Sequence, residues 1–181
     1  MKLIIKAMST LLLLGVVTPA YAYTWFTPEA LMESYFPGVT TAAEEWVPDT
    51  TAAAEFKARV GYTLPSPRYT VHVAGPADAP VGYALVDEQL GQHEPITFGV
   101  KLRPDCVIER IEVMVYREAY GEGVRAEVFR SQFVGKRASD PLRVGKDVQL
   151  VSGATISSRA LATGARRAAA LCEVWRAGVG A

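Results

Sequence analysis

The residues best suited to chemistry lie at 151–158, a stretch dense in hydroxyl-bearing and small side chains. A long helical pattern follows it, which indicates a loop that becomes a helix N-terminus. Ser152 is predicted to be the N-cap, Gly153 to let another group approach the backbone, and Ala154 to open the helix. Thr155 would then lie in the first turn, where free backbone N–H groups and the helix dipole attract a phosphate.

The hydroxyls of Ser157 and Ser158 lie close to Thr155 in sequence and are expected to help hold such a phosphate. The same residues also suit a helix that is merely capped by a serine, because serine is a common first residue of helices. The residues alone therefore leave two interpretations open, a phosphate site and a plain helix cap.

Residues 152–158, Ser-Gly-Ala-Thr-Ile-Ser-Ser, resemble the S-G-A-T-x-[ST]-S flavinylation motif of the FMN-binding domain family, which includes RnfG- and NqrC-like subunits of membrane redox complexes. The resemblance implies that Thr155 carries FMN through a phosphoester bond, and that a separate FAD:protein FMN transferase forms this bond. The family usually has Asp three residues before the motif serine, where this chain has Gln149, with Asp147 two residues further upstream. By the same resemblance, the cofactor site includes Ser152, Gly153, Ala154, Ser157 and Ser158.

A second glycine-containing stretch, residues 118–123, is similar to the E-T-P-G-L-G loop that covers the flavin in this family. Glu118, Gly121 and Gly123 match the family pattern, and the two glycines permit close approach of a flat or bulky group. Tyr120 replaces the family's proline, and it either stacks on the isoalloxazine ring or is an ordinary exposed loop residue.

Charge is distributed unevenly along the chain. Residues 23–98 hold 3 basic and 10 acidic side chains, whereas residues 99–181 hold 14 basic and 9 acidic ones. The basic second half suits an anionic cofactor, and Arg159, one helical turn past Thr155, is the candidate phosphate partner. The alternative is that these cations solvate helix and strand surfaces. The slight excess of acid over residues 23–181 argues against nucleic acid as a partner.

The first 22 residues have the features of a secretory signal peptide. Lys2 and Lys6 precede the apolar run 11–17, and Ala20-Tyr21-Ala22 has the small-x-small form of a cleavage site. The apolar run is too short to span a bilayer comfortably. We therefore expect cleavage after Ala22, a periplasmic location, and one domain at residues 23–181.

The remaining patterns predict an α+β fold, with an antiparallel sheet packed by helices and the cofactor loop at the start of the C-terminal helix. Two short helices are expected, one capped by Thr27 and stopping at Pro37, the other running from Asp49 or Thr50 to a left-handed cap at Gly61. Alternating or extended segments predict four strands at 69–73, 81–86, 95–102 and 107–116. In the last of these, the alternation predicts one face on the core.

The C-terminal helix carries an apolar stripe formed by Ala154, Leu161, Ala165, Ala168, Cys172 and Trp175. Its charged residues, among them Arg167, are expected largely on other faces. Residues 124–143 are predicted to form a short helix and a loop over the sheet. Cys106, at a turn expected to be solvated, either pairs with Cys172 in a disulfide or both thiols stay free.

Other kinds of site find little support in the sequence. His72 and His93, the two histidines, lie in neither a haem-attachment nor a zinc motif, and Ser152 lacks the context of a hydrolase nucleophile. We therefore expect an extracytoplasmic electron-transfer flavoprotein that carries FMN and exchanges electrons with a membrane or periplasmic redox partner, and a carrier more than a stand-alone enzyme. The alternative is an exported non-redox ligand-binding or sensing module.

Overall fold

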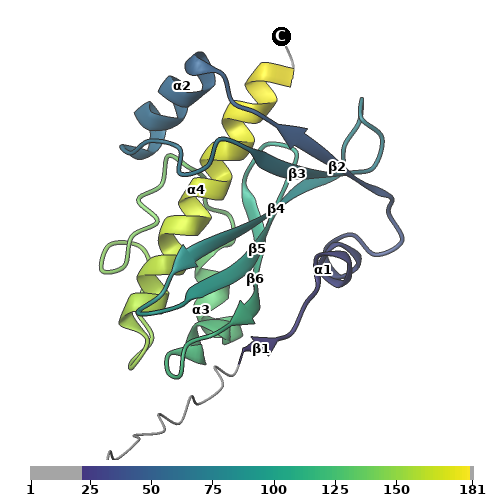
Figure 1. The fold of residues 1–181 in the computed structure, drawn as a ribbon. Helices are drawn as coiled ribbons and strands as arrows, with labels where there is room; N and C mark the ends of the chain where they lie inside the picture. Colours follow the sequence, from purple (N-terminus) through teal and green to yellow (C-terminus); the bar gives the residue numbers. More distant parts are fainter. Residues whose placement is uncertain (1–21, 180–181) are drawn as a thin grey trace, which may run out of the picture.

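The computed structural model describes residues 22–179, so the predicted signal peptide lies outside the described residues except for Ala22. Six antiparallel strands form one sheet in the order β1-β6-β5-β4-β3-β2 (Figure 1). In chain order they are β1 (Tyr23–Thr24), β2 (Thr41–Trp46), β3 (Tyr69–Ala74), β4 (Gly82–Leu90), β5 (Pro95–Leu102) and β6 (Ile108–Tyr116). The helices are α1 (Pro28–Tyr35), α2 (Thr50–Val60), α3 (Glu127–Arg130) and α4 (Thr155–Val179). The predicted single α+β domain with an antiparallel sheet is confirmed.

The four predicted strands correspond to β3, β4, β5 and β6. Strands β1 and β2 were not predicted from the sequence. β1 has only two residues, and β2 has small and acidic residues in place of the β-branched ones that favour strands, so neither carries a strand pattern of its own. Their pairing with β6 and β3 is what makes them strands.

The caps of the first two helices are as predicted. The Thr27 hydroxyl accepts a hydrogen bond from the N–H of Ala30 at 3.2 Å, and the Asp49 carboxylate accepts one from Ala52 at 2.7 Å. Gly61 ends α2 in the left-handed conformation with φ +87°. These contacts join residues three or four apart, so the local sequence determines them.

Helices cover both faces of the sheet. α4 crosses one face with α2 and α3 beside it, whereas α1 lies on the other (Figure 1). The expectation that residues 107–116 bury one face only is therefore wrong: Met114 packs in the α1 cluster, and Glu112 on the same side is 5% exposed. Within residues 22–179, no helix combines the length and apolar character that a membrane crossing requires.

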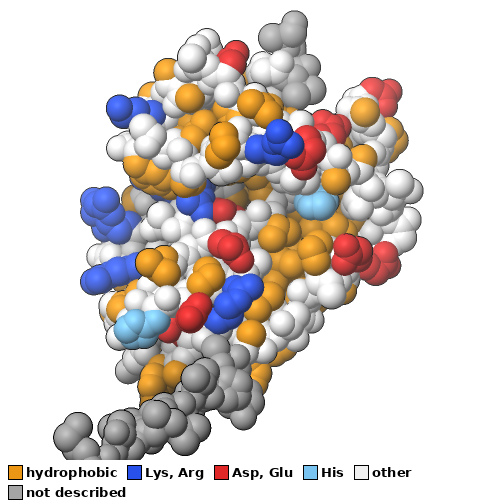
Figure 2. All heavy atoms as spheres, in the orientation of Figure 1, with side chains coloured by type: hydrophobic (Ala, Val, Ile, Leu, Met, Phe, Trp, Pro, Cys, Tyr) orange, Lys and Arg blue, Asp and Glu red, His pale blue; other side chains and the backbone are white. Residues whose placement is uncertain are grey.

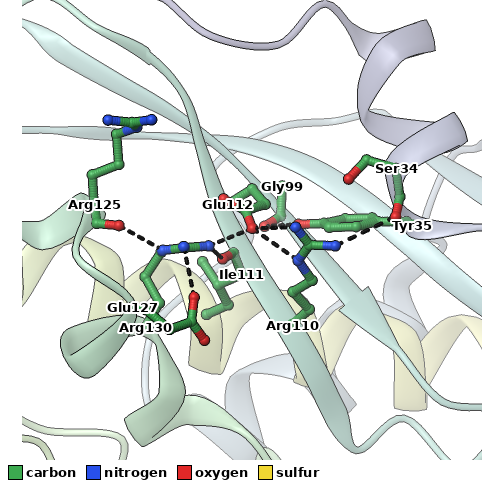
Figure 3. Close-up of polar contacts among 9 residues, drawn as sticks. All are labelled: Ser34, Tyr35, Gly99, Arg110, Ile111, Glu112, Arg125, Glu127 and Arg130. Atoms are coloured by element: carbon green, nitrogen blue, oxygen red, sulfur yellow. Dashed lines mark hydrogen bonds and ion pairs between the residues drawn. The ribbon is translucent and has the colours of Figure 1, made fainter.

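The buried carboxylate of Glu112 is held by arginines that approach it from two sides (Figure 3). Arg110, next to it on β6, contacts it at 2.8 Å, and Arg130 of α3 forms a second ion pair with it. Arg130 also donates to the carbonyl of Ile111 at 2.8 Å, on the part of β6 that extends past its short neighbour β1. The segment after β6 is therefore fastened to the strand that precedes it.

Residues 122–133 form that segment, consisting of the short helix η1 (Glu122–Arg125), then α3, then η2 (Ser131–Phe133). Phe129 and Phe133 are buried and stack edge to face at 5.4 Å between ring centroids. The predicted packing of this region over the sheet is confirmed.

Two contacts fix the middle and the end of α4. A disulfide joins Cys106, at the turn between β5 and β6, to Cys172, with a Cα–Cα distance of 5.7 Å. Cys106 is fully buried, so the expectation of a solvated turn is wrong for this residue. Arg167, expected on a polar face, is also buried and makes two hydrogen bonds of 2.6 and 2.5 Å with Asp87 of β4. An arginine on the buried side of a helix needs a carboxylate to balance its charge. The sequence of the helix does not show that a strand will supply one.

Candidate functional site

The candidate site begins at the turn that leads into α4. Residues 151–154 form this turn, closed by a hydrogen bond of 3.0 Å from the N–H of Ala154 to the carbonyl of Val151. Gly153 has φ +75°, a conformation that L side chains rarely adopt. The helix starts at Thr155, so Ala154 holds the position before it and Ser152 lies exposed in the turn. The prediction of Ser152 as N-cap is therefore wrong, because the turn at Gly153 delays the helix.

The first turn of α4 presents free backbone donors. The N–H of Ser158 is bonded to the carbonyl of Ala154 at 2.8 Å. Among the described residues, the N–H groups of Thr155, Ile156 and Ser157 have no such acceptor. Three unpaired donors at the positive end of a helix of 25 residues can hold one anionic group, as the sequence predicts.

The three hydroxyls of this turn differ sharply in their surroundings. Thr155 is partly exposed, whereas Ser157 and Ser158 are buried. Ser158 Oγ accepts a hydrogen bond from the N–H of Val151 at 3.2 Å, and Ser157 Oγ lies 2.8 Å from Tyr116 Oη. Both buried serines are therefore engaged in holding the turn, and Thr155 is the residue of the three that is partly exposed.

Tyr116, at the end of β6, links the two predicted segments of the site. Its hydroxyl donates to the carbonyl of Tyr120 at 2.6 Å, which uses its one proton, so Ser157 is the donor in the contact between the two hydroxyls. Burial raises the pKa of Tyr116 despite the bond from Ser157, and the phenol keeps its proton. Tyr116 was not predicted as a site residue, because Ser157, its partner in the first turn of α4, is 41 residues away along the chain.

Glu118, expected in the loop that covers the flavin, is buried and contacts the turn between β4 and β5. Its carboxylate accepts hydrogen bonds from the N–H groups of His93 and Glu94, at 2.6 and 3.1 Å, in the turn between β4 and β5. Burial alone would raise the pKa of Glu118, but these backbone bonds and one from Gln92 outweigh it, so the pKa lies below its ordinary value. This carboxylate thus holds the hairpin turn.

The glycines of residues 118–123 let this loop lie directly on the start of α4. A Cβ at Gly121 would meet Tyr116 Oη at 2.6 Å and Ser157 Oγ at 2.8 Å, and one at Gly123 would meet Val151 at 2.8 Å. The structure therefore does bring the two predicted segments together. The group that approaches these glycines closely is the protein itself, and Tyr120 beside them is 85% exposed.

Arg159 lies on another side of α4, in the wall of a cavity of about 540 Å³. Arg143 and Arg166 share this cavity with it, and neither was singled out from the sequence. Arg166 could not be found that way, since segments distant in sequence, the end of α2 at 59–60 and the loop at 138, supply its hydrogen-bond acceptors.

Gln149, the residue upstream of the motif that departs from the family pattern, is exposed. The backbone of Gln149 is paired with the side chain of Gln132, through bonds of 2.7 and 3.2 Å. Asp147 is engaged elsewhere, since it accepts from Lys136 and from the backbone of Leu142 and Arg143. Asp147 therefore holds its own loop together and does not take the place of the missing aspartate.

Comparison of the chain with sequence models of protein families points to the same region of the fold. Residues 91–170 match the sequence model of the FMN-binding domain family. The match runs from the turn after β4 into the middle of α4, so it contains Glu118, the glycine loop and Thr155. It supports FMN as the cofactor. No curated protein matches the chain.

Proposed function

We propose that this protein is an extracytoplasmic electron-transfer flavoprotein that carries FMN as a phosphoester on Thr155. An RnfG- or NqrC-like role, with an FAD:protein FMN transferase as the modifying enzyme and a membrane or periplasmic redox partner, follows from the motif at 152–158. Bound FMN would supply the redox chemistry, taking up and releasing electrons at its isoalloxazine ring.

The observation that carries the proposal is the position of Thr155. It is the first residue of α4 and is partly exposed, and the first turn has three free backbone N–H groups. These donors would hold the phosphate while the helix dipole favours its negative charge. Ser157 and Ser158 are buried and hydrogen-bonded, so they compete poorly as acceptors of the ester.

The uncharged Gln149 bears on how the ester would form. A carboxylate next to the acceptor loop could take the hydroxyl proton of Thr155, which an amide cannot do. Burial alone would raise the pKa of Asp147, but the backbone N–H of Arg143 and the bond of 2.9 Å from Lys136 outweigh it and lower this pKa. The transferase would therefore have to supply the base for this chain.

The disulfide supports export. Cys106 and Cys172 are 66 residues apart and joined across the core, an arrangement that persists in oxidising compartments such as the periplasm. Strand β1 starts at Tyr23, the first residue of the predicted mature chain, so cleavage after Ala22 would leave this strand whole. Both features fit a periplasmic domain at 23–181.

The test is co-expression with the transferase and mass spectrometry of the periplasmic protein. The expected species starts at Tyr23 and carries the mass of one FMN less water, with fluorescence that survives denaturation. Thr155→Val should remove the adduct because it keeps the shape and loses the nucleophile, whereas the matched control Ser152→Ala, in the exposed turn, should keep it.

An adduct on Thr155→Val would assign the ester to another hydroxyl. A wild-type protein without any flavin would favour the non-redox binding module in place of the flavoprotein.

A further inference from the structure

Strands β3 and β4 are paired over only part of their length. β3 pairs with β2 along all six of its residues, whereas in the described chain it pairs with β4 at three positions, the last being His72 opposite Ala84. β4 continues past this point to Leu90, paired with β5 alone. The two strands therefore part beyond His72, and each turns an unpaired edge toward the other (Figure 1).

The backbone groups of two residues point into this gap. The N–H of Gly75 bonds to the carbonyl of Thr40 on the β2 side at 3.0 Å. Because backbone groups alternate in direction along a strand, the N–H and C=O of Thr70 point the other way, toward β4. By the same alternation, Val86 points its groups toward β3, as does Ala84 two residues before it.

The edge of β4 is closed again after Val86. The N–H of Glu88 bonds to the Asp87 carboxylate at 2.9 Å, and the carbonyl of Glu88 accepts from Arg167 at 2.7 Å. The backbone groups of Thr70 and Val86 therefore form a short unpaired set. An unpaired strand edge is a template for another strand, and here two such edges face one another.

A cavity of about 490 Å³ lies in the gap. Thr70 and Val86 both line it, and α4 contributes Ala168 and Leu171 to its floor. The cavity therefore has a free backbone edge on two sides and apolar surface beneath. An extended chain, which advances roughly 3.3 Å per residue and bonds to neighbours on both sides, suits such a space.

A second cavity continues the groove on the α1 side of the sheet. Its volume is about 310 Å³, and it shares Pro28 and His72 with the first cavity. A chain lying in the gap has to leave the plane of the sheet at His72, where the strands pair again, and this second cavity is next to it. Glu29 and Glu33 line the second cavity, and its described lining contains no Lys or Arg.

The charge of this side of the protein favours a basic occupant. Residues 23–98, which supply α1 and strands β2 to β4, hold 3 basic and 10 acidic side chains. Burial lowers the pKa of His72 despite the nearby Glu29, so at neutral pH its imidazole does not offset the carboxylates. In Figure 2 Asp and Glu side chains lie along the right edge, the side on which α1 and β2 lie in Figure 1, whereas Lys and Arg lie along the left edge.

We propose that this groove binds an extended, basic segment of a partner protein. A short β-forming stretch inserts between β3 and β4, and Lys or Arg residues beside it lie against Glu29 and Glu33. Alternate residues of the inserted stretch bond to Thr70 on one side and to Val86 on the other. Since β3 and β4 are antiparallel, the inserted strand is antiparallel to one of them and parallel to the other. No flavin takes part, so the test is separate from that of the proposed function.

The probe is a peptide of alternating Val and Thr residues with lysines at both ends, added to the purified protein. Amide hydrogen exchange is followed residue by residue by NMR. The N–H groups of Thr70 and Val86 should exchange rapidly in the protein alone and about tenfold more slowly with saturating peptide. The N–H of Val71, which faces β2, is the matched control and should be slow in both samples.

Two changes separate the backbone bonds from the charge. A peptide N-methylated at alternate residues lacks the donors and should protect neither amide. The double variant Glu29→Gln/Glu33→Gln should bind the lysine peptide about fivefold more weakly, as expected for two exposed ion pairs. Glu55→Gln, on α2 at the other face of the sheet, should bind it as wild type does.

Four results would overturn the proposal. The lysine peptide may fail to bind, or bind without protecting Thr70 and Val86, which would mean that the gap takes no such strand. Both amides may already exchange slowly in the protein alone at every concentration, which would mean that β3 and β4 are paired there in solution. Protection that grows with protein concentration, without peptide, would assign the groove to a second copy of this chain.

Discussion

Replacing both cysteines by serine should cost a large part of the stability of this domain. The disulfide between Cys106 and Cys172 closes a loop of 66 residues, and the loop-closure entropy of such a loop corresponds to ~4 kcal/mol at 25 °C. Both residues are fully buried, so the two serine hydroxyls also have to be accommodated in the core. For a domain of this size, a loss of that magnitude lowers Tm by roughly 8–16 °C.

The assay is urea unfolding of the double variant and of wild type, each with and without a thiol reductant. Reductant should bring wild type close to the double variant and leave the double variant unaffected. The reasoning is refuted if the double variant loses less than about 1 kcal/mol, or if unfolded, unreduced wild type reacts as two free thiols. Either result would mean that packing alone holds the turn before β6 against α4.

Two further predictions concern the elements around the site. Gly121→Ala should be more destabilising than Gly61→Ala. Both glycines have positive φ, but only the new Cβ at 121 meets other atoms, Tyr116 Oη and Ser157 Oγ. Equal losses of stability in urea unfolding would contradict the close contact. The carboxylate of Glu118 has a pKa below its ordinary value, since backbone hydrogen bonds outweigh the effect of burial. Its contribution to stability is therefore present above the unfolded pKa of about 4.3, and it is lost as the pH falls through the lower folded value. Glu118→Gln should therefore flatten the acid side of the stability profile, and a profile parallel to that of wild type would exclude this role.

Features fixed by neighbours in the chain were predictable. The cap contacts of Thr27 and Asp49 and the left-handed Gly61 involve residues three or four apart, and the structure has all three. The four predicted strands follow from their own composition and alternation. In each case the residues that make the structure are the ones that signal it.

Features that depend on a distant partner were not predictable. Arg167 appears polar along the helix but is buried because β4 supplies Asp87, and β2 is a strand because β3 pairs with it. Gly121 illustrates the same limit at the site. Its small size is visible in the sequence, whereas the identity of the group that fills the space, Ser157 of α4, depends on the fold.

The two ends of α4 are adapted to different tasks. Its second half is fixed to the sheet by the ion pair of Arg167 with Asp87 and by the disulfide at Cys172. Its first turn has no such anchor except two buried serines, and it leaves Thr155 partly exposed and three backbone N–H groups unpaired. A hydroxyl at the end of a rigid helix keeps a defined direction, which a hydroxyl on a free loop would not. The helix would therefore give a cofactor on Thr155 a fixed point of attachment on the fold.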